Sequence, residues 1–271
     1  MPEFEEPKSL QAFEYRLRLD GGVTRPILAG AYDDEDTTYE VVLKLRRPGV
    51  RDGNFGPTSL ACELICSVIG RATGLSVPDY FVVNVDEEFV ASVPDRSLRG
   101  LLRDNLGPNF ATTYLVGFAR YEPSSARAST DLLDALEGAL SFDATVINGD
   151  RKASKSNLLR RGDNLFAIDH SYALPVNLWP VGHNDAGELF PEDQITGHCA
   201  FDVLRQQGRA YDLRMNEWLA HVTPTELARL RSWIPAEWET DPGELERIFR
   251  FLGDRSQIFP ALKEELRRVV G

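Results

Sequence analysis

The chain reads Ile147-Asn148-Gly149-Asp150-Arg151-Lys152, then Asn157-Leu158-Leu159, and then Leu165-Phe166-Ala167-Ile168-Asp169-His170. In this order an acid follows an apolar run, an amide comes later in the loop, and a second acid ends a short apolar strand. A carboxylate such as Asp169 is costly to bury unpaired, so it needs a cation or a metal. Carboxylate and amide oxygens, together with phosphate oxygens, are the ligands that Mg²⁺ prefers. The stretch therefore predicts an oxygen-rich metal site with a further acid, Asp150, beside it.

The order of these three residues is more informative than any one of them. Asp150 alone fits an ordinary turn in a Gly-containing loop, and Asn157 alone is uninformative. An acid, an amide and an acid in this order, on a loop–strand–turn–strand unit after a helix, are typical of kinase-like phosphotransferases. The sequence contains neither the Gly-x-Ser-x-Gly motif of many serine hydrolases nor a Walker A loop.

Composition narrows the class of protein. The chain has 271 residues, enough for one large or two modest domains, with 42% hydrophobic and 27% charged residues, as in soluble globular proteins. Its net charge of −12 argues against nucleic acid as a primary partner, whereas a nucleotide pocket needs only a few local cations. The acidic N-terminal segment does not look like a signal peptide, and no apolar run is long enough to span a bilayer. We therefore expect a cytoplasmic protein without a membrane partner.

The hydrophobic pattern predicts an α+β chain with two lobes. The first half alternates with period two and the second half has helical spacing. We expect strands or extended segments over residues 12–19, 24–32, 39–45, 80–85, 89–93 and 109–118, and a helix over 58–72. We expect helices over residues 130–146, 200–206, 212–220, 225–232, 242–252 and 260–270, and short strands over 157–159 and 165–168. The β-rich lobe, with one main helix, would comprise residues 1–112, and the mostly helical lobe residues 113–271.

Three features of the first half are suited to a nucleotide. Lys44 ends a predicted strand, and a lysine that reaches a phosphate is usually held by a carboxylate, for which Glu63 on the next helix is the natural candidate. The alternative is a solvated lysine and an ordinary surface glutamate, and periodicity does not fix the face of Glu63. The turn at Gly21-Gly22 could hold phosphates through its backbone N–H groups, although it does not spell Gly-x-Gly-x-x-Gly and fits a plain hairpin equally well.

With these residues in view, the chain resembles the HipA-like kinases, specifically compact bacterial members without a long N-terminal extension. The resemblance covers roughly residues 10–265, and the longer gap from Asp150 to Asn157, compared with eukaryotic protein kinases, is a family feature. Lys152 and Ser171 depart from the family pattern, but neither change removes a catalytic atom. The matching segments are Val42-Leu43-Lys44, Ala61-Cys62-Glu63-Leu64-Ile65, Thr73-Gly74-Leu75-Ser76-Val77-Pro78, Gly107-Pro108-Asn109-Phe110-Ala111, Asn148-Gly149-Asp150-Arg151-Lys152, Lys155-Ser156-Asn157-Leu158-Leu159 and Ile168-Asp169-His170-Ser171.

The resemblance implies a role for each residue of the opening stretch. Asp150 would orient or deprotonate the acceptor hydroxyl. Asn157 and Asp169 would bind Mg²⁺, which bridges the β- and γ-phosphates of ATP. Arg151, grouped with Asp150 as catalytic, would either stabilise transferred charge or hold the loop.

The resemblance also implies the nucleotide half of the site and a bilobal, protein-kinase-like fold. Lys44 would contact the α- and β-phosphates with Glu63 as its partner, and the turn that contains Gly22 would cover the phosphates. The segment 113–117 would be the hinge between the lobes, where Tyr114, Leu115 and Val116 present backbone groups to adenine.

The function that follows from the resemblance is ATP- and Mg²⁺-dependent phosphoryl transfer, most simply by a Ser/Thr protein kinase with a toxin-like or regulatory role and an antitoxin-like regulator. A small-molecule kinase of aminoglycoside-phosphotransferase type, or a lipid kinase, remains open because the same residues serve either acceptor. A nucleotide-binding pseudokinase is a further alternative, although the intact set Lys44, Asp150, Asn157 and Asp169 argues against it. An AMP-transferase would keep the same active site and bind ATP in reverse. The sequence does not name the acceptor.

Overall fold

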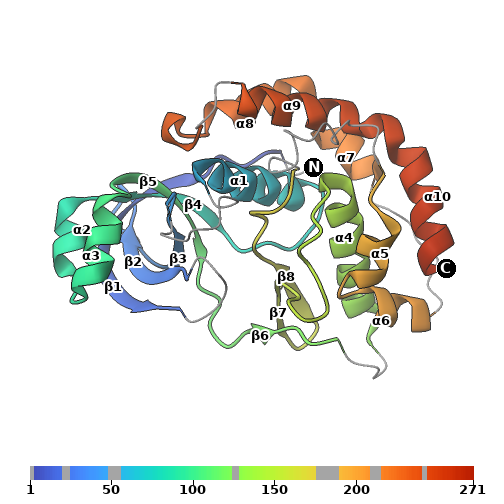
Figure 1. Ribbon diagram of the computed structural model, residues 1–271, viewed down its shortest axis with the longest axis horizontal. Coiled ribbons are helices and arrows are strands. Elements are labelled where there is room, and N and C mark those ends of the chain that lie inside the picture. Colours follow the sequence, from blue (N-terminus) through green and yellow to red (C-terminus); the bar gives the residue numbers. More distant parts are fainter. Residues whose placement is uncertain are drawn as a thin grey trace.

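The computed structural model describes residues 3–19, 25–47, 56–123, 128–174, 189–207, 215–239 and 243–271. Figure 1 shows a curled sheet at one end of the molecule, a small second sheet near its middle, and an arc of helices over the other end. The α+β class predicted from the sequence is confirmed.

The first sheet is a closed five-stranded barrel. Its strands are β1 (Lys8–Arg18), β2 (Ile27–Tyr32), β3 (Thr38–Lys44), β4 (Tyr80–Val85) and β5 (Gly107–Thr113), in the order β1-β2-β3-β5-β4. The parallel pairing of β1 with β4 closes the barrel, whereas the other pairs are antiparallel. Alternate side chains from all five strands fill its interior, as the period-two pattern predicts.

Two short helices, α2 (Glu87–Ser92) and α3 (Arg96–Arg103), lie against this barrel, at the left of Figure 1. The prediction of a strand over residues 89–93 was wrong. Asp86 accepts a hydrogen bond from the Phe89 N–H at 2.8 Å, and this N-cap starts a helix whose Phe89 and Val90 are buried. Asp95 caps α3 in the same way. Local capping outweighed the strand propensity of the apolar residues.

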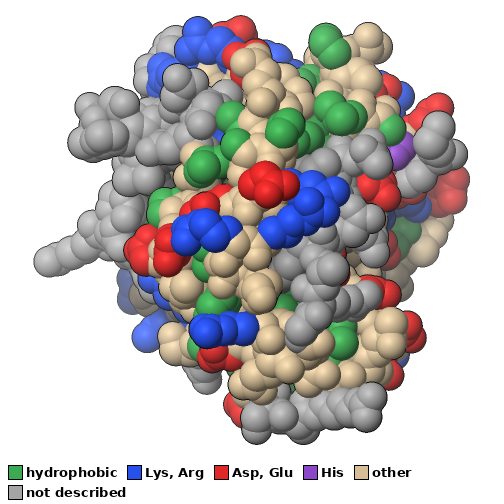
Figure 2. Space-filling model, turned by 90° about the vertical axis from the view of Figure 1, so that its right-hand side faces the viewer, with side chains coloured by type: hydrophobic (Ala, Val, Ile, Leu, Met, Phe, Trp, Pro, Cys, Tyr) green, Lys and Arg blue, Asp and Glu red, His purple; other side chains and the backbone are tan. Residues whose placement is uncertain are grey.

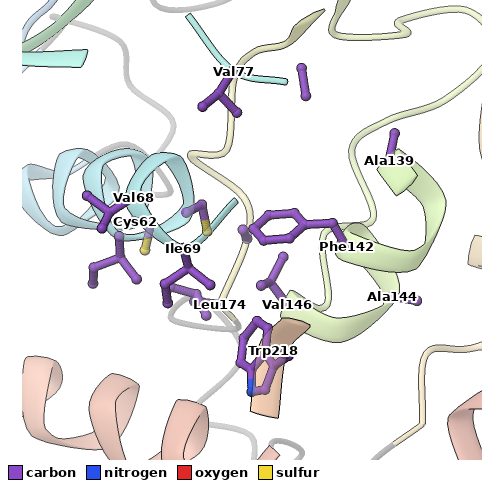
Figure 3. Close-up of a cluster of buried hydrophobic side chains, with 14 of the residues drawn as sticks. Cys62, Val68, Ile69, Val77, Ala139, Phe142, Ala144, Val146, Leu174 and Trp218 are labelled. Carbon is purple, nitrogen blue, oxygen red and sulfur yellow. The ribbon is translucent and has the colours of Figure 1, made fainter. Parts of the chain in front are cut away.

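Helix α1 (Pro57–Ala72) is the most enclosed helix of the fold. All of its residues are buried except Ser59 and Arg71. Figure 3 shows Cys62 and Ile69 of α1 in one buried cluster with Phe142 of α4 (Thr130–Val146) and Trp218 of α7 (Met215–His221). Because α1 is enclosed along almost its whole length, its acidic residue, Glu63, is placed inside the molecule.

The C-terminal part surrounds α1 and α4. A three-stranded sheet, β6 (Ala119–Arg120), β7 (Leu158–Arg161) and β8 (Asn164–Ala167), lies beside α4. The remaining helices are α5 (Glu192–Gly197), α6 (Phe201–Gln206), α8 (Pro224–Ser232), α9 (Glu244–Asp254) and α10 (Phe259–Val270), with 3-10 turns η2 (Ala236–Trp238) and η3 (Arg255–Ile258). The predicted helices of this half are confirmed where the structure describes them, and α5 and β6 were not predicted.

The face on the right of Figure 1 carries acidic and basic side chains side by side, as Figure 2 shows. On α10, Arg268 pairs with Glu265 at 2.6 Å and with Glu192 of α5 at 2.5 Å. Exposed pairs of this kind contribute little to stability. Among the described helices none is both long and apolar enough to cross a membrane.

Candidate active site

A cavity of about 260 Å³ lies between the barrel and the β6–β7–β8 sheet. The barrel, α1, the segment after β5 and the loops around β7 and β8 all contribute to its wall. Its lining includes Val42, Lys44, Glu63, Thr113, Tyr114, Leu115, Phe118, Arg120, Lys155, Asn157, Leu159, Ile168 and Asp169. Residues that the sequence assigned to two separate halves therefore meet at one cavity.

Lys44 joins these halves. Its Nζ donates to Oε1 of Glu63 and, at 2.8 Å, to Oδ1 of Asp169, which lies 125 positions further along the chain. Glu63 also reaches the second segment directly, because its Oε2 accepts the backbone N–H of His170 at 3.0 Å. The alternative of a solvated Lys44 and a surface Glu63 is excluded by their side-chain exposures of 16% and 2%.

The charges of this cluster compensate one another. Burial opposes the charge on Lys44, but the attraction of Asp169 and Glu63 outweighs it and raises the lysine pKa. Burial also opposes ionisation of Asp169, yet the Lys44 cation dominates and holds the aspartate pKa well below its usual range. Burial raises the pKa of Glu63 to about 7 despite the nearby Lys44. At neutral pH, Lys44 is thus a fixed cation and Asp169 a fixed anion at the edge of the cavity.

The loop after α4 brings Asp150 to the same place. Oδ2 of Asp150 accepts hydrogen bonds from Nδ2 of Asn157 at 3.2 Å and from Nζ of Lys155 at 2.6 Å. Lys155 also lies 3.8 Å from Oδ2 of Asp169. Sequence reasoning missed Lys155, although a basic residue two positions before Asn157 in a loop with two acids was a usable signal. The lysine ammonium lies between the two carboxylates that the sequence singled out.

Arg151 lies behind this loop. Its side chain is 1% exposed, and its guanidinium donates to the Asp143 carboxylate and to the backbone carbonyl oxygens of Asn157 and Ile168. Of the two roles that the resemblance allows, this position favours that of holding the loop. Arg151 ties the segments that carry Asn157 and Asp169 to α4.

Asp143 anchors Arg151, and sequence reasoning missed it. It is fully buried on α4 and accepts hydrogen bonds from Arg151, from Nδ2 of Asn148 at 2.9 Å, and from Nε2 of His198 at 3.0 Å. Nδ1 of His198 accepts the Ala200 N–H at 3.1 Å, so the imidazole proton is on Nε2 and points at Asp143. Although burial opposes ionisation, Arg151 and His198 outweigh it and lower the pKa of Asp143 to about 2. An acid in the apolar run Phe142-Asp143-Ala144 was the signal in the sequence.

The backbone adopts positive φ angles at two of the predicted site residues and at the end of α4. Asn157 and Asp169 have φ angles of 47° and 61°, and Ile147 ends α4 with φ 54°. This left-handed region is tolerated by Asn and Asp, but it is strained for a β-branched residue such as Ile147. The Asp143 and Arg151 hydrogen bonds described above help to hold these conformations in place.

Of the three predicted hinge residues, two line the cavity. Tyr114 and Leu115 line the cavity, and the Tyr114 N–H donates to the Glu40 carbonyl oxygen at 2.9 Å, which fixes the segment after β5 to β3. Val116 does not line the cavity and is 64% exposed. Gly22, assigned to the phosphate-covering turn, lies outside the described residues.

The donor set around Asp169 is suited to a hard cation that also binds a phosphate. Within the described ranges, no group of three or more His, Cys, Asp or Glu side chains could hold a metal alone. The oxygens of Asp169 and Asn157 supply only part of a coordination shell, which Mg²⁺ usually completes with water and phosphate. These residues therefore fit a Mg²⁺–nucleotide pair better than a structural metal.

Two buried histidines near the site make stability depend on pH. Burial lowers the pKa of His170 to about 3 and also lowers that of His198, whereas Glu63 is shifted upward. Between pH 6.5 and 4.5 the unfolded chain would bind protons at both histidines that burial disfavours in the folded chain, and the folded chain would retain one proton on Glu63. His170 and Glu63 offset each other, so the lowered pKa of His198 makes the free energy of unfolding fall on acidification, by at most about 1.4 kcal/mol per pH unit.

Denaturant titrations at several pH values measure this slope. His170→Asn removes one of the two histidines and is expected to flatten the profile, whereas His221→Gln, at the C-terminal end of α7, leaves the slope unchanged. A wild-type free energy of unfolding that rises on acidification between pH 6.5 and 5 would contradict the buried neutral histidines.

Comparisons with known proteins identify the family of the chain. A family model described as HipA-like kinase matches residues 16–257. A comparison with curated proteins found no match. Among solved structures, the chain is similar to the proinflammatory kinase CtkA of Helicobacter pylori, with a TM-score of 0.49 and 12% identity over 96% of this chain and 97% of that one.

Two further structures show weaker likeness. One is the MAP kinase LmaMPK10 of Leishmania major, with a TM-score of 0.26 and 13% identity over 94% of this chain and 82% of that one. The other is a complex of Neurospora crassa PAN2 with the pseudokinase and C-terminal part of PAN3, with a TM-score of 0.30 and 10% identity over 99% of this chain and 65% of that one.

Proposed function

This chain belongs to the HipA-like kinase family, and we propose that it is an ATP- and Mg²⁺-dependent phosphotransferase acting on a hydroxyl group of a protein. The observation that carries the proposal is the contact of Lys44 with both Glu63 and Asp169 at the edge of one cavity. In this proposal the chain is bilobal, with lobes of residues 1–112 and 113–271 and the nucleotide between them.

The cavity suits adenine at its apolar end. Val42 of β3, Leu159 of β7 and Ile168 would enclose the base, and all three line the cavity. The N–H of Leu115 has no hydrogen-bond partner among the described residues, which leaves it available to the base. Lys44, held by Glu63, would then reach the α- and β-phosphates.

Asn157 and Asp169 would hold Mg²⁺, which supplies neutralisation of the charge on the β- and γ-phosphates. Lys155 would add a protein cation on the same side, since it already lies 3.8 Å from Asp169. With three cations facing the phosphates, charge that moves to the leaving oxygen is stabilised where it develops.

Asp150 would orient the acceptor. The acceptor oxygen would form a bond to the γ-phosphorus as the bond to the β–γ bridging oxygen breaks, releasing ADP, and the hydroxyl proton would pass to Asp150. The hydrogen bond from Asn157 fixes one carboxylate oxygen, leaving the other to face the hydroxyl. The family resemblance, rather than the geometry, supports a Ser/Thr acceptor, a toxin-like or regulatory role and an antitoxin-like partner.

Intact-mass spectrometry of the protein and candidate acceptor proteins incubated with Mg·ATP tests the proposal. A gain of one phosphate on the protein itself or on an acceptor protein supports it. A gain of AMP would assign the same site to adenylyl transfer. ATP consumed only with a sugar or lipid acceptor would assign it to a small-molecule or lipid kinase, and no transfer to any acceptor would indicate a pseudokinase.

Lys155→Ala is expected to affect phosphoryl transfer without affecting the stability of the fold. Removing the cation between Asp150 and Asp169 is expected to lower kcat by about 10²–10³-fold, since a single preorganised donor is worth that much. The free energy of unfolding is expected to change by less than about 1 kcal/mol, because the Lys155 side chain is one-third exposed. Lys152→Ala, in the same loop but exposed, is the matched control. Equal activity of the two variants would contradict the role of Lys155.

A further inference from the structure

A second cavity, of about 290 Å³, lies on the opposite face of the β7–β8 pair from the nucleotide cavity. Leu159 lines the nucleotide cavity, whereas the preceding residue, Leu158, lines the second one. Successive side chains of a strand point to opposite faces, so the sheet separates the two cavities. The other walls are the N-terminal half of α4 and the loop from Gly74 to Ser76, and Figure 1 shows α4 beside this sheet.

Gly138 forms part of this cavity although nothing around it requires a glycine. It lies in the interior of α4, where glycine destabilises a helix relative to alanine. A Cβ at this position would meet nothing within 4 Å. The missing side chain therefore leaves open space on a helix surface, and a separate recess of about 30 Å³ shares the lining residues Gly138 and Leu75 with the cavity.

The recess contains an unpartnered polar group. The Ser141 side chain is 6% exposed, and its Oγ has no hydrogen-bond partner among the described residues. A buried hydroxyl without a partner costs free energy, so an occupant that reached from the cavity into this recess with a donor or acceptor would be favoured. Ser141 lines this neighbouring recess and not the cavity itself.

The charge around the cavity selects a cation. Asp131, Asp134 and Asp163 line it, and its lining contains no Lys or Arg among the described residues. Asp163 pairs with Arg160 only at 3.8 Å, and its side chain is 54% exposed. Leu75 and Leu165, which lies on the same face of the sheet as Leu158, supply an apolar floor. Acids at the rim over an apolar floor match a side chain with an aliphatic stem and a cationic head.

The size of the cavity limits the occupant to about one such side chain. Pockets for drug-sized ligands occupy about 300–1,000 Å³, so 290 Å³ lies at the lower limit of that range. We propose that this cavity is a docking site for a basic segment of a partner protein, which inserts one arginine or lysine side chain along Gly138 between α4 and β8. The site is separate from the catalytic cavity and its occupation does not depend on phosphotransfer.

Fluorescence anisotropy with a labelled hexa-arginine peptide and the full chain tests this proposal. Saturable binding is expected to weaken at least about tenfold in Gly138→Leu, which fills the cavity. The matched control is Gly100→Leu, in the interior of α3, where a Cβ also meets nothing within 4 Å. It is expected to bind like the wild type. Asp131→Asn, which keeps the shape of the cavity, provides a second variant and is expected to weaken binding through charge alone.

Each outcome decides the proposal. Both Gly→Leu variants are expected to unfold at or above the wild-type midpoint, because leucine favours helix over glycine. Equal binding by wild type and Gly138→Leu would overturn the proposal and assign the affinity to the net charge of −12. Absence of binding would overturn it as well. Competition by free L-arginine at the concentration of the peptide would assign the cavity to a small molecule and overturn docking by a protein segment.

Discussion

Asp169→Asn is expected to lower phosphotransfer by about 10³-fold or more while leaving the protein folded. The substitution keeps the shape of the side chain but removes the anionic oxygens that face Lys44 and would hold Mg²⁺. Lys44 retains Glu63 as a partner, so no buried cation is left alone. The measurement is ADP release at saturating Mg·ATP, with folding checked by the denaturation midpoint.

The matched control for this variant is Asp104→Asn at the end of α3, far from the cavity, which is expected to keep wild-type activity. If Asp169→Asn retained full phosphotransfer, the assignment of Asp169 to the metal would be wrong. A loss of activity accompanied by unfolding would instead locate the role of Asp169 in stability.

Asp143→Ala is expected to destabilise the fold by about 3–5 kcal/mol, a large part of the stability of a typical domain. The substitution leaves the buried guanidinium of Arg151 without its carboxylate and leaves Nε2 of His198 without an acceptor. Urea titration at neutral pH measures the change. Asp202→Ala, an exposed acid in the first turn of α6, is the control and is expected to stay within about 0.5 kcal/mol of the wild type.

A double-variant cycle separates the ion pair from general packing. Asp143→Ala combined with Arg151→Met removes both buried charges, so the combined loss is expected to be smaller than the sum of the single losses. Additive losses, or a loss below about 1 kcal/mol in Asp143→Ala, would show that Asp143 does not hold Arg151 and the loop in place.

The parts of the fold that the sequence predicts well have strong periodicity. Helices α1 and α4 and strand β4 lie within one residue of their expected bounds, because each carries a continuous apolar pattern with clear ends. Residues 89–93 failed because four of the five are apolar, and only the Asp86 cap distinguishes the helix from a strand. Capping is a contact of a single residue and leaves little trace in hydrophobic periodicity.

The residues of the candidate site also differ in how far the sequence pattern reveals them. Asp150, Asn157 and Asp169, which the structure brings together, could be proposed as site residues because their order along one segment is informative. The pairing of Lys44 with Glu63 could only be suggested. Nearly all of α1 is buried, so its hydrophobic pattern does not show which face of the helix carries Glu63. Lys155 and Asp143 were missed because their importance depends on partners that come together only in three dimensions.

Mg²⁺-dependent ATP binding, measured by titration calorimetry on the wild type and on Asp169→Asn, tests the central claim most directly. The claim is that Lys44 and the segment after β5 form one nucleotide site with Asn157 and Asp169. The wild type is expected to bind ATP about tenfold or more tightly with Mg²⁺ than without it, and Asp169→Asn is expected to bind ATP but to lose that difference. Absence of ATP binding in the wild type, or an unchanged Mg²⁺ effect in Asp169→Asn, would contradict the claim.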